Sequence, residues 1–462
     1  MEENILNEEE LLQEVELLLS KRQFTKIKEI LSQLNPTDVA SILSQIEMAH
    51  LAYIFRILPK EFASEVFVDM DSDTQEHLIK SFTDRELKEV LDELFVDDTV
   101  DIIEEMPANV VKRILKNSQP DARKAINEIL NYPKDSVGSV MTIEFVDLKK
   151  DMTVADAFER IRKTGYDKET IYTCYVVDKN RKLEGLVTVR TLLLADSSAK
   201  ISDIMETNVI FANTLEDKEA IAIKFDKYDF MAIPVVDNED RLVGIVTFDD
   251  AMEVIIEEST EDFSKMAAIN PTTESYFKTS VWTHSKNRIL WLLFLMLSAT
   301  VTGMIIQEYE TAFKTVPILV SFIPMLMGTG GNCGSQSSTM VIRGLALDEI
   351  KSKDLLKAIF KEFRIALVVG FLLSVVNAIR IIIMYNKSQD INAYILALVL
   401  GITLVLVVVL AKVIGCILPI VAKKCKLDPA IMAAPIITTI LDTCSVLIFF
   451  NIANVFMCQI IK

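Results

Sequence analysis

Apolar residues are spread unevenly along the chain, and the pattern changes near residue 286. From there on, five apolar stretches are each long enough to cross a bilayer as a helix. They cover residues 289–306, 316–341, 365–384, 391–421 and 430–460. The fourth and fifth stretches are longer than a bilayer requires, so these helices are expected to tilt or to protrude. The pattern predicts a transmembrane domain of five helices over residues 289–462.

Basic residues between the predicted spans indicate how this domain is oriented. Two of the inter-span loops are rich in Lys and Arg, which favours the cytoplasmic side. These residues are Arg343, Lys351, Lys353, Lys357, Lys361 and Arg364 in one loop, and Lys423, Lys424 and Lys426 in the other. The sequence thus predicts a multi-pass protein of the cytoplasmic (inner) membrane, with a cytosolic N-terminus and an extracytoplasmic C-terminus.

Before residue 286 the pattern is that of soluble domains. Residues 1–130 consist of short amphipathic segments, each introduced by a helix start signal. These signals stand at Asn35/Pro36, Pro59, Asp71, Thr83, Asp97 and Pro107. Because short helices that follow one another closely stack side by side, residues 1–130 are predicted to form an acidic α-helical superhelix.

Residues 137–257 contain an internal repeat with a spacing of 59 residues. The string YVVDKNRKLEGLVTVR from Tyr175 matches PVVDNEDRLVGIVTFD from Pro234. Each copy predicts a strand, a turn, a second strand and a helix. We therefore expect two α/β domains, at 137–198 and 199–257, followed by a connecting helix region at 258–288.

Charge and composition narrow the functional classes. The chain has 66 acidic and 48 basic residues, and 57 of the acidic residues lie in residues 1–285. This acidity argues against binding to nucleic acid and leaves solubility or metal binding as its explanation. The six cysteines lack paired spacing and are read as reduced core residues. With three histidines and no nucleophile motif, an enzyme is the least favoured class.

One carboxylate, Asp442, stands in the middle of an apolar span. A charge at the centre of a bilayer costs about 2.5–3.5 kcal/mol on insertion scales, so it usually faces a pathway or a partner. Pro435 precedes it and frees backbone carbonyls that can line a water-filled path. The alternative is a packing seam in which Asp442 pairs with Lys412 or Arg380.

The second span is rich in small residues. It contains the run GTGGNCGSQSST at residues 328–339, which allows close approach of neighbouring helices. Asn332 and Gln336 are one turn apart and share a face.

Two long strings carry a family resemblance. PMLMGTGGNCGSQSSTMVIRGLALDEI (324–350) and KLDPAIMAAPIITTILD (426–442) resemble the signatures of MgtE-type magnesium channels and transporters. The resemblance implies a homodimer around one pore, in which Asp442 recognises hydrated Mg²⁺ and Asp428 lies near the cytoplasmic end. Mg²⁺ dehydrates reluctantly, so oxygen ligands can recognise it through its water shell. The sequence departs from the family pattern at Cys333 and Ser445, where Ala and Gly are expected. These larger residues are expected to narrow the helix contacts or to change the ion preference.

The same resemblance implies regulatory Mg²⁺ sites in the cytosolic half. On the helical domain they would use Glu65, Asp97 and Asp101. On the other side they would use Asp217, Glu219, Asp229, Asp250, Glu253, Glu258, Glu261 and Asp262. The spacing alone puts Asp97, Asp101 and Glu105 on one helix face, for which a solvated charged surface is the alternative. Mg²⁺ between these carboxylates would relieve their repulsion, so the compact form is expected only when Mg²⁺ is plentiful.

The repeat is similar to a tandem pair of cystathionine-β-synthase (CBS) domains, which often bind adenine nucleotides. The second copy keeps the nucleotide-associated Thr247 and Asp250, whereas the first copy has Thr188 but Thr191 in the Asp position. The candidate nucleotide-binding residues are Thr188, Arg190, Phe230, Thr247 and Asp250. Whether ATP or another adenine nucleotide binds there is left open.

Together these features predict a multi-domain membrane protein with four parts: an N-terminal α-helical superhelix, a tandem α/β CBS pair, a connecting helix, and a five-span all-α transmembrane bundle. The expected function is a homodimeric, Mg²⁺-selective channel or transporter, gated shut by cytosolic Mg²⁺ and not an enzyme. One alternative is a membrane-anchored CBS nucleotide sensor, which would have no use for Asp442. A less selective carrier of divalent cations such as Mn²⁺ or Co²⁺ is another. An anion channel is disfavoured, because its pore should present basic residues.

Overall fold

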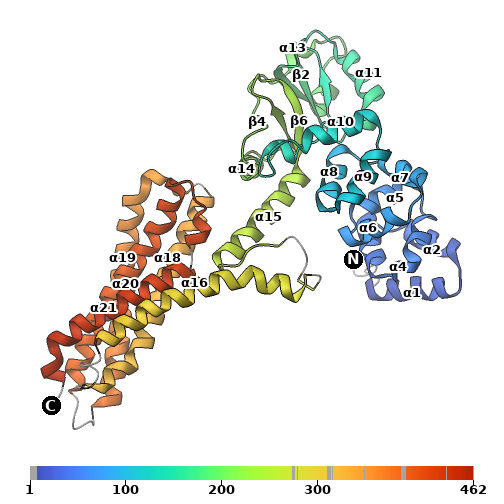
Figure 1. Cartoon of the computed structure of the whole chain (residues 1–462). Coiled ribbons are helices and arrows are strands. Elements are labelled where there is room, and N and C mark those ends of the chain that lie inside the picture. The colour runs from blue at the N-terminus through green and yellow to red at the C-terminus, as the bar shows by residue number, and fades with distance from the viewer. Residues whose placement is uncertain are drawn as a thin grey trace. The chain divides into compact units, whose positions relative to one another are not determined.

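The computed structural model describes residues 8–272, 276–277, 279–309, 314, 316–347, 349–386, 392–432 and 434–460. The chain divides into two compact units, Met1–Ile255 and Ile256–Lys462. Each unit has its own core and is described by itself (Figure 1).

The first unit begins with a superhelix of short helices. They are α1 (Glu8–Ser20), α2 (Phe24–Leu31), α3 (Pro36–Gln45), α4 (Met48–Phe55), α5 (Lys60–Val68), α6 (Ser72–Ser81), α7 (Asp84–Leu91), α8 (Val96–Glu105), α9 (Ala108–Asn117) and α10 (Pro120–Ile129). Most helices pack on the helix two places along, α1 on α3 and α3 on α5 for example. Buried residues such as Ile27, Leu51 and Phe67 form one core along this stack, which confirms the predicted superhelix.

Sequence signals at the helix starts explain why these helices are short. Five of the predicted signals are the residues immediately before a helix: Asn35, Pro59, Asp71, Thr83 and Pro107. The side chain of Asp71 accepts a hydrogen bond from the backbone of Thr74 at 2.9 Å, and Thr83 forms a capping box with Glu86. The helix expected to start at Asp97 begins one residue earlier, at Val96.

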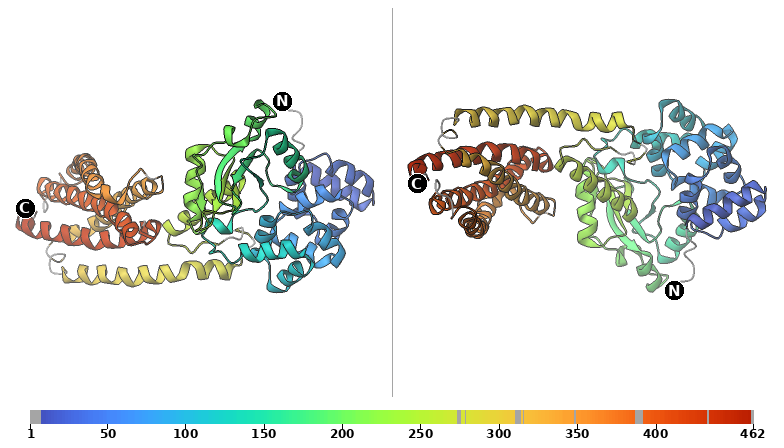
Figure 2. Two further views of the ribbon diagram at one scale, coloured as in Figure 1. Left: turned by 90° about the horizontal axis from the view of Figure 1, so that it is seen from above. Right: turned by 90° about the horizontal axis from the view of Figure 1, so that it is seen from below.

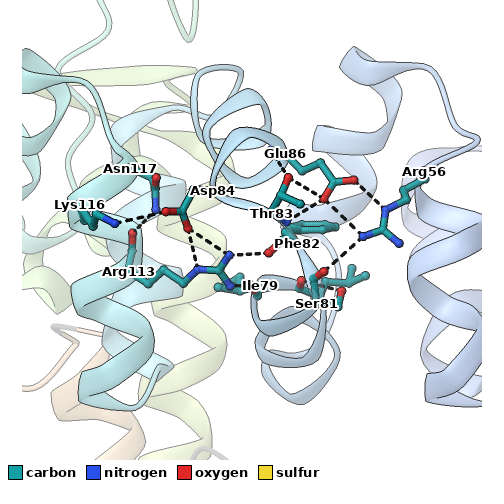
Figure 3. A network of polar contacts seen from close by, with 11 residues as sticks. Arg56, Ile79, Ser81, Phe82, Thr83, Asp84, Glu86, Arg113, Lys116 and Asn117 are labelled. Atoms are coloured by element: carbon teal, nitrogen blue, oxygen red, sulfur yellow. Dashed lines mark hydrogen bonds and ion pairs between the residues drawn. The ribbon is translucent and has the colours of Figure 1, made fainter.

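Two arginines clamp the turn between α6 and α7 (Figure 3). Arg113 of α9 donates to two backbone carbonyls at the end of α6 and lies 3.3 Å from a carboxylate oxygen of Asp84. On the other side, Arg56, the residue after α4, forms an ion pair with Glu86 at 2.7 Å. The hydrogen bond from Arg56 lowers the pKa of Glu86 to about 2. The superhelix is thus tied by charged contacts between helices that are distant in sequence.

The rest of the first unit is a pair of α/β domains with the same topology. The first comprises η1 (Val137–Ser139), β1 (Val146–Leu148), α11 (Val154–Thr164), η2 (Gly165–Asp167), β2 (Thr173–Val177), β3 (Leu183–Thr188) and α12 (Val189–Leu194). The second comprises α13 (Ile201–Ile204), β4 (Ala212–Asn213), α14 (Lys218–Tyr228), β5 (Ala232–Val236), β6 (Leu242–Thr247) and α15 (Phe248–Met266). Each sheet has a parallel and then an antiparallel pair, in the orders β1-β2-β3 and β4-β5-β6.

The two domains exchange backbone hydrogen bonds crosswise. The N–H of Thr142, ahead of β1, donates to the carbonyl of Ile245 in β6 at 2.8 Å. At the equivalent place in the other repeat, Leu186 of β3 and Glu206 donate to one another at 2.9 Å. Each sheet therefore continues with a residue from the other repeat, and the two copies form one pair.

The second unit consists of the end of α15 and the apolar helices. These elements are α16 (Val281–Glu308), η3 (Pro317–Phe322), α18 (Ile323–Ala346), η4 (Ser352–Asp354), α19 (Leu355–Tyr385), α20 (Ala393–Lys424), η5 (Pro429–Met432) and α21 (Ala434–Ile460). In the described part of the chain, four segments are long and apolar enough to cross a membrane: Val281–Glu308, Leu355–Tyr385, Ala393–Lys424 and Pro429–Phe456. α18 occupies the predicted second span, but its glycines and polar residues make it less apolar.

α20 is the central helix of this bundle. It packs against α18, α19 and α21, and over half of its apolar window is buried. α16 packs along α21 (Figure 2), where Tyr309 stacks on Phe450 with ring centroids 4.7 Å apart. α16 and α19 leave most of their apolar surface exposed, as expected for helices that face lipid. The predicted fold class is confirmed.

Candidate cation sites

Three aspartates of α8 lie opposite its core-facing side. Val96, Val100 and Ile103 are buried, which leaves the acidic residues directed at the CBS pair. These residues are Asp97, Asp98 and Asp101. The charge of Asp250, in the first turn of α15, acts on all three. Asp250 itself accepts hydrogen bonds from the backbone and hydroxyl of Thr247, and these fix its carboxylate at the start of the helix.

The environment of these aspartates disfavours their charged forms. Burial, and to a lesser degree the charge of Asp250, raises the pKa of Asp97 well above its usual range. The same two causes raise the pKa of Asp98 to about 6. Asp101 is exposed at its surface, but the protein atoms around its carboxylate displace water, and this loss of hydration and the charges of Glu253 and Asp250 raise its pKa to about 8. At neutral pH, the face of α8 therefore needs protons or another cation.

Two glutamates of the first CBS domain join this group, and sequence reasoning missed both. Burial raises the pKa of Glu169 to about 7, with a further contribution from the charge of Asp98. Glu144 acts on Asp97 and Asp98, and its carboxylate accepts a hydrogen bond from the hydroxyl of Thr142 at 2.7 Å. Both are isolated acids outside any periodic pattern, so only the folded domain brings them near α8.

We call this group the acidic cluster. It comprises Asp97, Asp98, Asp101, Glu144, Glu169, Asp249, Asp250 and Glu253. One carboxylate oxygen of Asp97 is enclosed and has no hydrogen-bond partner among the described residues, so the donor set fits a hard divalent cation. Across the described residues, however, no three acidic, His or Cys side chains come close enough to hold one metal ion. The cluster thus concentrates charge without forming a closed coordination shell.

Other predicted ligands lie at the ends of their own helices. Asp217 and Glu219 stand at the start of α14, where the Asp217 side chain accepts a hydrogen bond from the backbone of Glu219 at 3.0 Å. Asp229 ends the same helix in a left-handed conformation with φ 54°. Glu65 is exposed on α5. In this structure none of them completes a metal-binding group within the described part of the chain.

The last turns of α15 contact the loop that leads into α21. Lys265 lies 2.6 Å from carboxylate oxygens of both Glu261 and Asp428. Burial lowers the pKa of Lys265, but its hydrogen bonds to these two acids outweigh this effect and raise the pKa. Burial and the charge of Asp428 raise the pKa of Asp262. The charge of Lys265 also acts on Asp262, so three of the predicted ligands, Glu261, Asp262 and Asp428, are gathered around one ammonium group. Glu258, another predicted ligand, lies on the same helix.

The candidate nucleotide residues are divided between the repeats. Thr188 and Thr247 are the residues before α12 and α15, and the Thr188 hydroxyl lies 3.0 Å from that of Thr191. Phe230 stacks on Tyr228, and Asp250 belongs to the acidic cluster. Two clefts of the CBS pair, of about 280 and 240 Å³, are lined by other residues.

The membrane carboxylate Asp442 is half-buried on α21 and makes no hydrogen bond or ion pair with any residue that the structure describes. The alternative in which it pairs with Lys412 or Arg380 is wrong. Lys412 lies 3.6 Å from Glu362 instead, and Arg380 donates to Asn377 at 2.8 Å. Both cations point to α18 and α19, away from α21. The residue after Asp442, Thr443, is hydrogen-bonded to Thr302 of α16 at 2.8 Å.

The glycines of α18 allow α20 and α21 to approach closely. A Cβ atom on Gly330 would lie 2.9 Å from the hydroxyl of Ser445, and one on Gly331 would lie 2.9 Å from a methyl group of Thr438. A Cβ atom on Gly415 of α20 would clash with the Gly334 carbonyl. Ser445 is 1% exposed, so the larger residue at this position fills the space that Gly330 leaves.

Comparison with known proteins covers nearly the whole chain. The model of the MgtE intracellular N domain matches residues 34–135, and that of the CBS domain matches 137–198 and 201–257. The MgtE model, described as a divalent cation transporter, matches 323–452. The magnesium transporter MgtE of Thermus thermophilus is 32% identical over 97% of this chain and 99% of its own length. The chain belongs to the MgtE family.

Other members of the MgtE family give the same result. The magnesium transporter MgtE of Bacillus subtilis is 34% identical, over 88% of this chain and 91% of its own. A crystal structure of the cytosolic domain of the Mg²⁺ channel MgtE in complex with ATP has a TM-score of 0.50 and 32% identity, and covers 53% of this chain and 99% of that one. The crystal structure of the soluble part of a magnesium transporter has a TM-score of 0.51 and 26% identity. It covers 55% of this chain and 100% of that one.

These matches confirm the family resemblance seen in the sequence. MgtE proteins are membrane transporters or channels, and this chain is a multi-pass membrane protein.

Proposed function

We propose that this MgtE-family chain is a Mg²⁺ channel or transporter that admits hydrated Mg²⁺ across the cytoplasmic membrane. The observation that carries the proposal is Asp442, a carboxylate inside the membrane bundle without a partner among the described residues. Such a group usually marks an ion pathway. The magnesium transporters to which the chain is similar supply the identity of the ion.

A homodimer with one central pore is part of this proposal. In the single chain, Asn332 and Gln336 are exposed on the face of α18 that does not pack against α20 or α21. A second copy facing this surface would line a path with amide groups and with the two Asp442 carboxylates. Carboxylate and amide oxygens can hold a hydrated Mg²⁺ through its water shell.

We propose that cytosolic Mg²⁺ closes the pore by binding to the acidic cluster and to the carboxylates at the end of α15. The raised pKa values in the cluster support this role, because like charges there repel unless a cation intervenes. Asp428 would contact the ion at the cytoplasmic pore end, where Lys265 competes for the same carboxylate.

Nucleotide binding at the CBS pair is a second candidate function, favoured by the ATP complex of the related cytosolic domain. Thr247 and Asp250 offer polar groups for ribose hydroxyls, and Arg190 offers a charge for phosphate. Phe230 and Thr188 would complete the site. Equilibrium dialysis of the full-length protein with labelled ATP tests this proposal; binding that persists in Thr247→Val together with Arg190→Ala would contradict it.

Transport is tested with the purified protein in liposomes that contain a Mg²⁺-sensitive dye. The proposal expects Mg²⁺ uptake that external Mn²⁺ or Co²⁺ inhibits only at higher concentration. Uptake of Co²⁺ or Mn²⁺ in preference to Mg²⁺ would favour the less selective carrier. No uptake of any divalent cation would favour the nucleotide-sensor alternative.

A further inference from the structure

A buried polar network joins three helices of the membrane unit away from Asp442. Its members are Ser337 of α18, Glu362 of α19 and Lys412 of α20. The Ser337 hydroxyl donates to Glu362 at 2.5 Å and accepts from the Lys412 ammonium at 3.1 Å. The ammonium lies 3.6 Å from the same carboxylate oxygen, and the two charged side chains are only 6% and 13% exposed. The hydroxyl thus bridges a buried ion pair.

The direction of Glu362 distinguishes it from its charged neighbours. Lys361 and Arg364 on the same helix are exposed, whereas Glu362 points into the bundle. Removing two charges from water costs several kcal/mol per ion, and only a well-placed partner offsets that cost. Lys412 and Glu362 therefore depend on each other in a way that surface ion pairs do not.

The network lies between two apolar layers, one helical turn away on each helix. One layer contains Cys333, Ala366, Val408, Ala411, Ile437 and Leu441. The other contains Val341, Leu345, Cys416 and Ile420, with Ala358 and Ile359 packed against it. Both layers exclude water, which strengthens a complete ion pair and makes an incomplete one costly.

The first of these layers connects the network to α21. Leu441, the residue before Asp442, packs there with Cys333, which precedes Ser337 by one turn of α18. The hydroxyl of Ser338 donates to the carbonyl of Met432, just ahead of α21, at 3.1 Å. α18 therefore holds α21 at two levels, and a shift of α18 along its axis would shift both contacts.

We propose that Lys412, Glu362 and Ser337 are positioning residues that fix the register of α18 against α19 and α20 and thereby place Asp442 for the hydrated cation. The inference rests on the proposed role of Asp442. Apolar side chains and glycines tolerate small sliding movements, whereas a bridged ion pair has one geometry. A slip of one residue would move a helix by about 1.5 Å. That distance is large for a site that recognises an ion through its water shell.

The sharpest variant is Ser337→Ala, which removes only the bridging hydroxyl and leaves both charges and the packing in place. Full-length protein in liposomes is assayed for Mg²⁺ and Co²⁺ uptake, and the ratio of the two rates is compared with the wild type. We expect the ratio to fall severalfold, because a shifted α18 no longer holds Asp442 where it suits the water shell of Mg²⁺. Lys361→Gln, at the exposed charge next to Glu362 on α19, is the matched control and should keep the wild-type ratio.

Glu362→Gln and Lys412→Met separate positioning from stability. Each single variant leaves one buried charge unpaired and should lower the melting temperature in detergent. The double variant has no unpaired charge, so its melting temperature should recover while its uptake ratio stays low. A folded double variant with the wild-type ratio, or an unchanged ratio in Ser337→Ala, would overturn the proposal. Wild-type liposomes that admit no divalent cation would contradict the proposed function itself.

Discussion

At the scale of single residues, the glycines between the membrane helices are the least replaceable positions. We predict that Gly415→Ala destabilises the bundle by about 1–3 kcal/mol, because the new methyl group would meet the backbone of Gly334, which cannot turn away. Gly303→Ala, at an exposed position of α16, is the control, since nothing lies within 4 Å of its Cβ position. Thermal unfolding in detergent measures both; equal melting temperatures would show that α18 and α20 are not in close contact.

The acidic cluster gives the protein a pH dependence whose sign follows from its raised pKa values. A carboxyl group whose pKa is higher in the folded state than in the unfolded state stabilises the fold at low pH. That stability is fully present below the ordinary carboxyl values of 3.8 and 4.5. It is lost as pH rises through about 6 for Asp98, 7 for Glu169 and 8 for Asp101.

We therefore predict that, without metal, the soluble unit melts at a lower temperature at pH 8.5 than at pH 5.5, by a few degrees. Mg²⁺ should raise the melting temperature more at pH 8.5, where it replaces the lost protons. Differential scanning calorimetry of the full-length protein, with and without Mg²⁺ at both pH values, measures these melting temperatures. Equal stabilisation by Mg²⁺ at the two pH values would contradict binding at the cluster.

At the scale of helices and strands, the Arg113 clamp shows how the superhelix is held together. Arg113→Met should destabilise the soluble unit by about 1–3 kcal/mol, because the two carbonyls at the end of α6 lose their donor. Arg85→Met is the control, since the side chain of Arg85 is 88% exposed and, among the described residues, pairs with Glu89 on its own helix alone; it should change stability by less than about 0.5 kcal/mol. Chemical unfolding, followed by circular dichroism, measures the free energy of unfolding of both variants. Similar losses of stability in the two variants would show that the contacts of Arg113 do not stabilise the superhelix.

Elements whose signals are local could be predicted from the sequence. Asp71 and Thr83 mark helix starts through their own side chains, and the spacing of 59 residues predicted the paired domains. The structure adds a strand irregularity at Val176/Val177 that recurs at Val235/Val236, which was not predicted from the sequence. The glycines of α18 predicted that neighbouring helices approach this span closely. Its closest contacts, with Gly415 and Leu441, depend on the packing of three helices and have no local signal.

The polar sites were predictable only in part, for the same reason. The face of α8 follows from helical spacing, and Asp442 stands out because its neighbours are apolar. Glu144 and Glu169 belong to the acidic cluster only because the first CBS domain folds near α8. Lys412 was considered as a partner of Asp442, because both are charges in apolar spans, but the bundle places it against Glu362.

At the scale of the whole molecule, the proposed gating mechanism depends on several weak sites acting together. Changing a channel from mostly open to mostly closed requires about 5.5 kcal/mol of differential binding. Lys265, bound between Glu261 and Asp428, already supplies one fixed positive charge. Mg²⁺ at the acidic cluster would supply the rest, so closure should depend steeply on its concentration.

Neutralising the cluster tests this gating mechanism. We predict that Asp97→Asn together with Asp250→Asn abolishes the Mg²⁺-dependent protection of the cytosolic domains from protease, which the wild type should show at about 1 mM Mg²⁺. The amide introduced by Asp250→Asn keeps an oxygen that can accept from Thr247, so α15 should stay capped. Asp38→Asn together with Asp121→Asn, at exposed first-turn positions, is the control. Full protection of the cluster variant at the same Mg²⁺ concentration would show that these acids do not bind the closing Mg²⁺ and act only as surface charges.

The central claim is that Asp442 carries the ion through the membrane. The most direct measurement is Mg²⁺ uptake by dye-filled liposomes containing wild-type protein, Asp442→Asn, or the exposed control Glu308→Gln. All three should fold and elute alike, because the side chain of Asp442 makes no hydrogen bond or ion pair within the described chain. We predict uptake by the wild type and the control, and none above empty liposomes for Asp442→Asn. Uptake at the wild-type rate by Asp442→Asn would contradict the account.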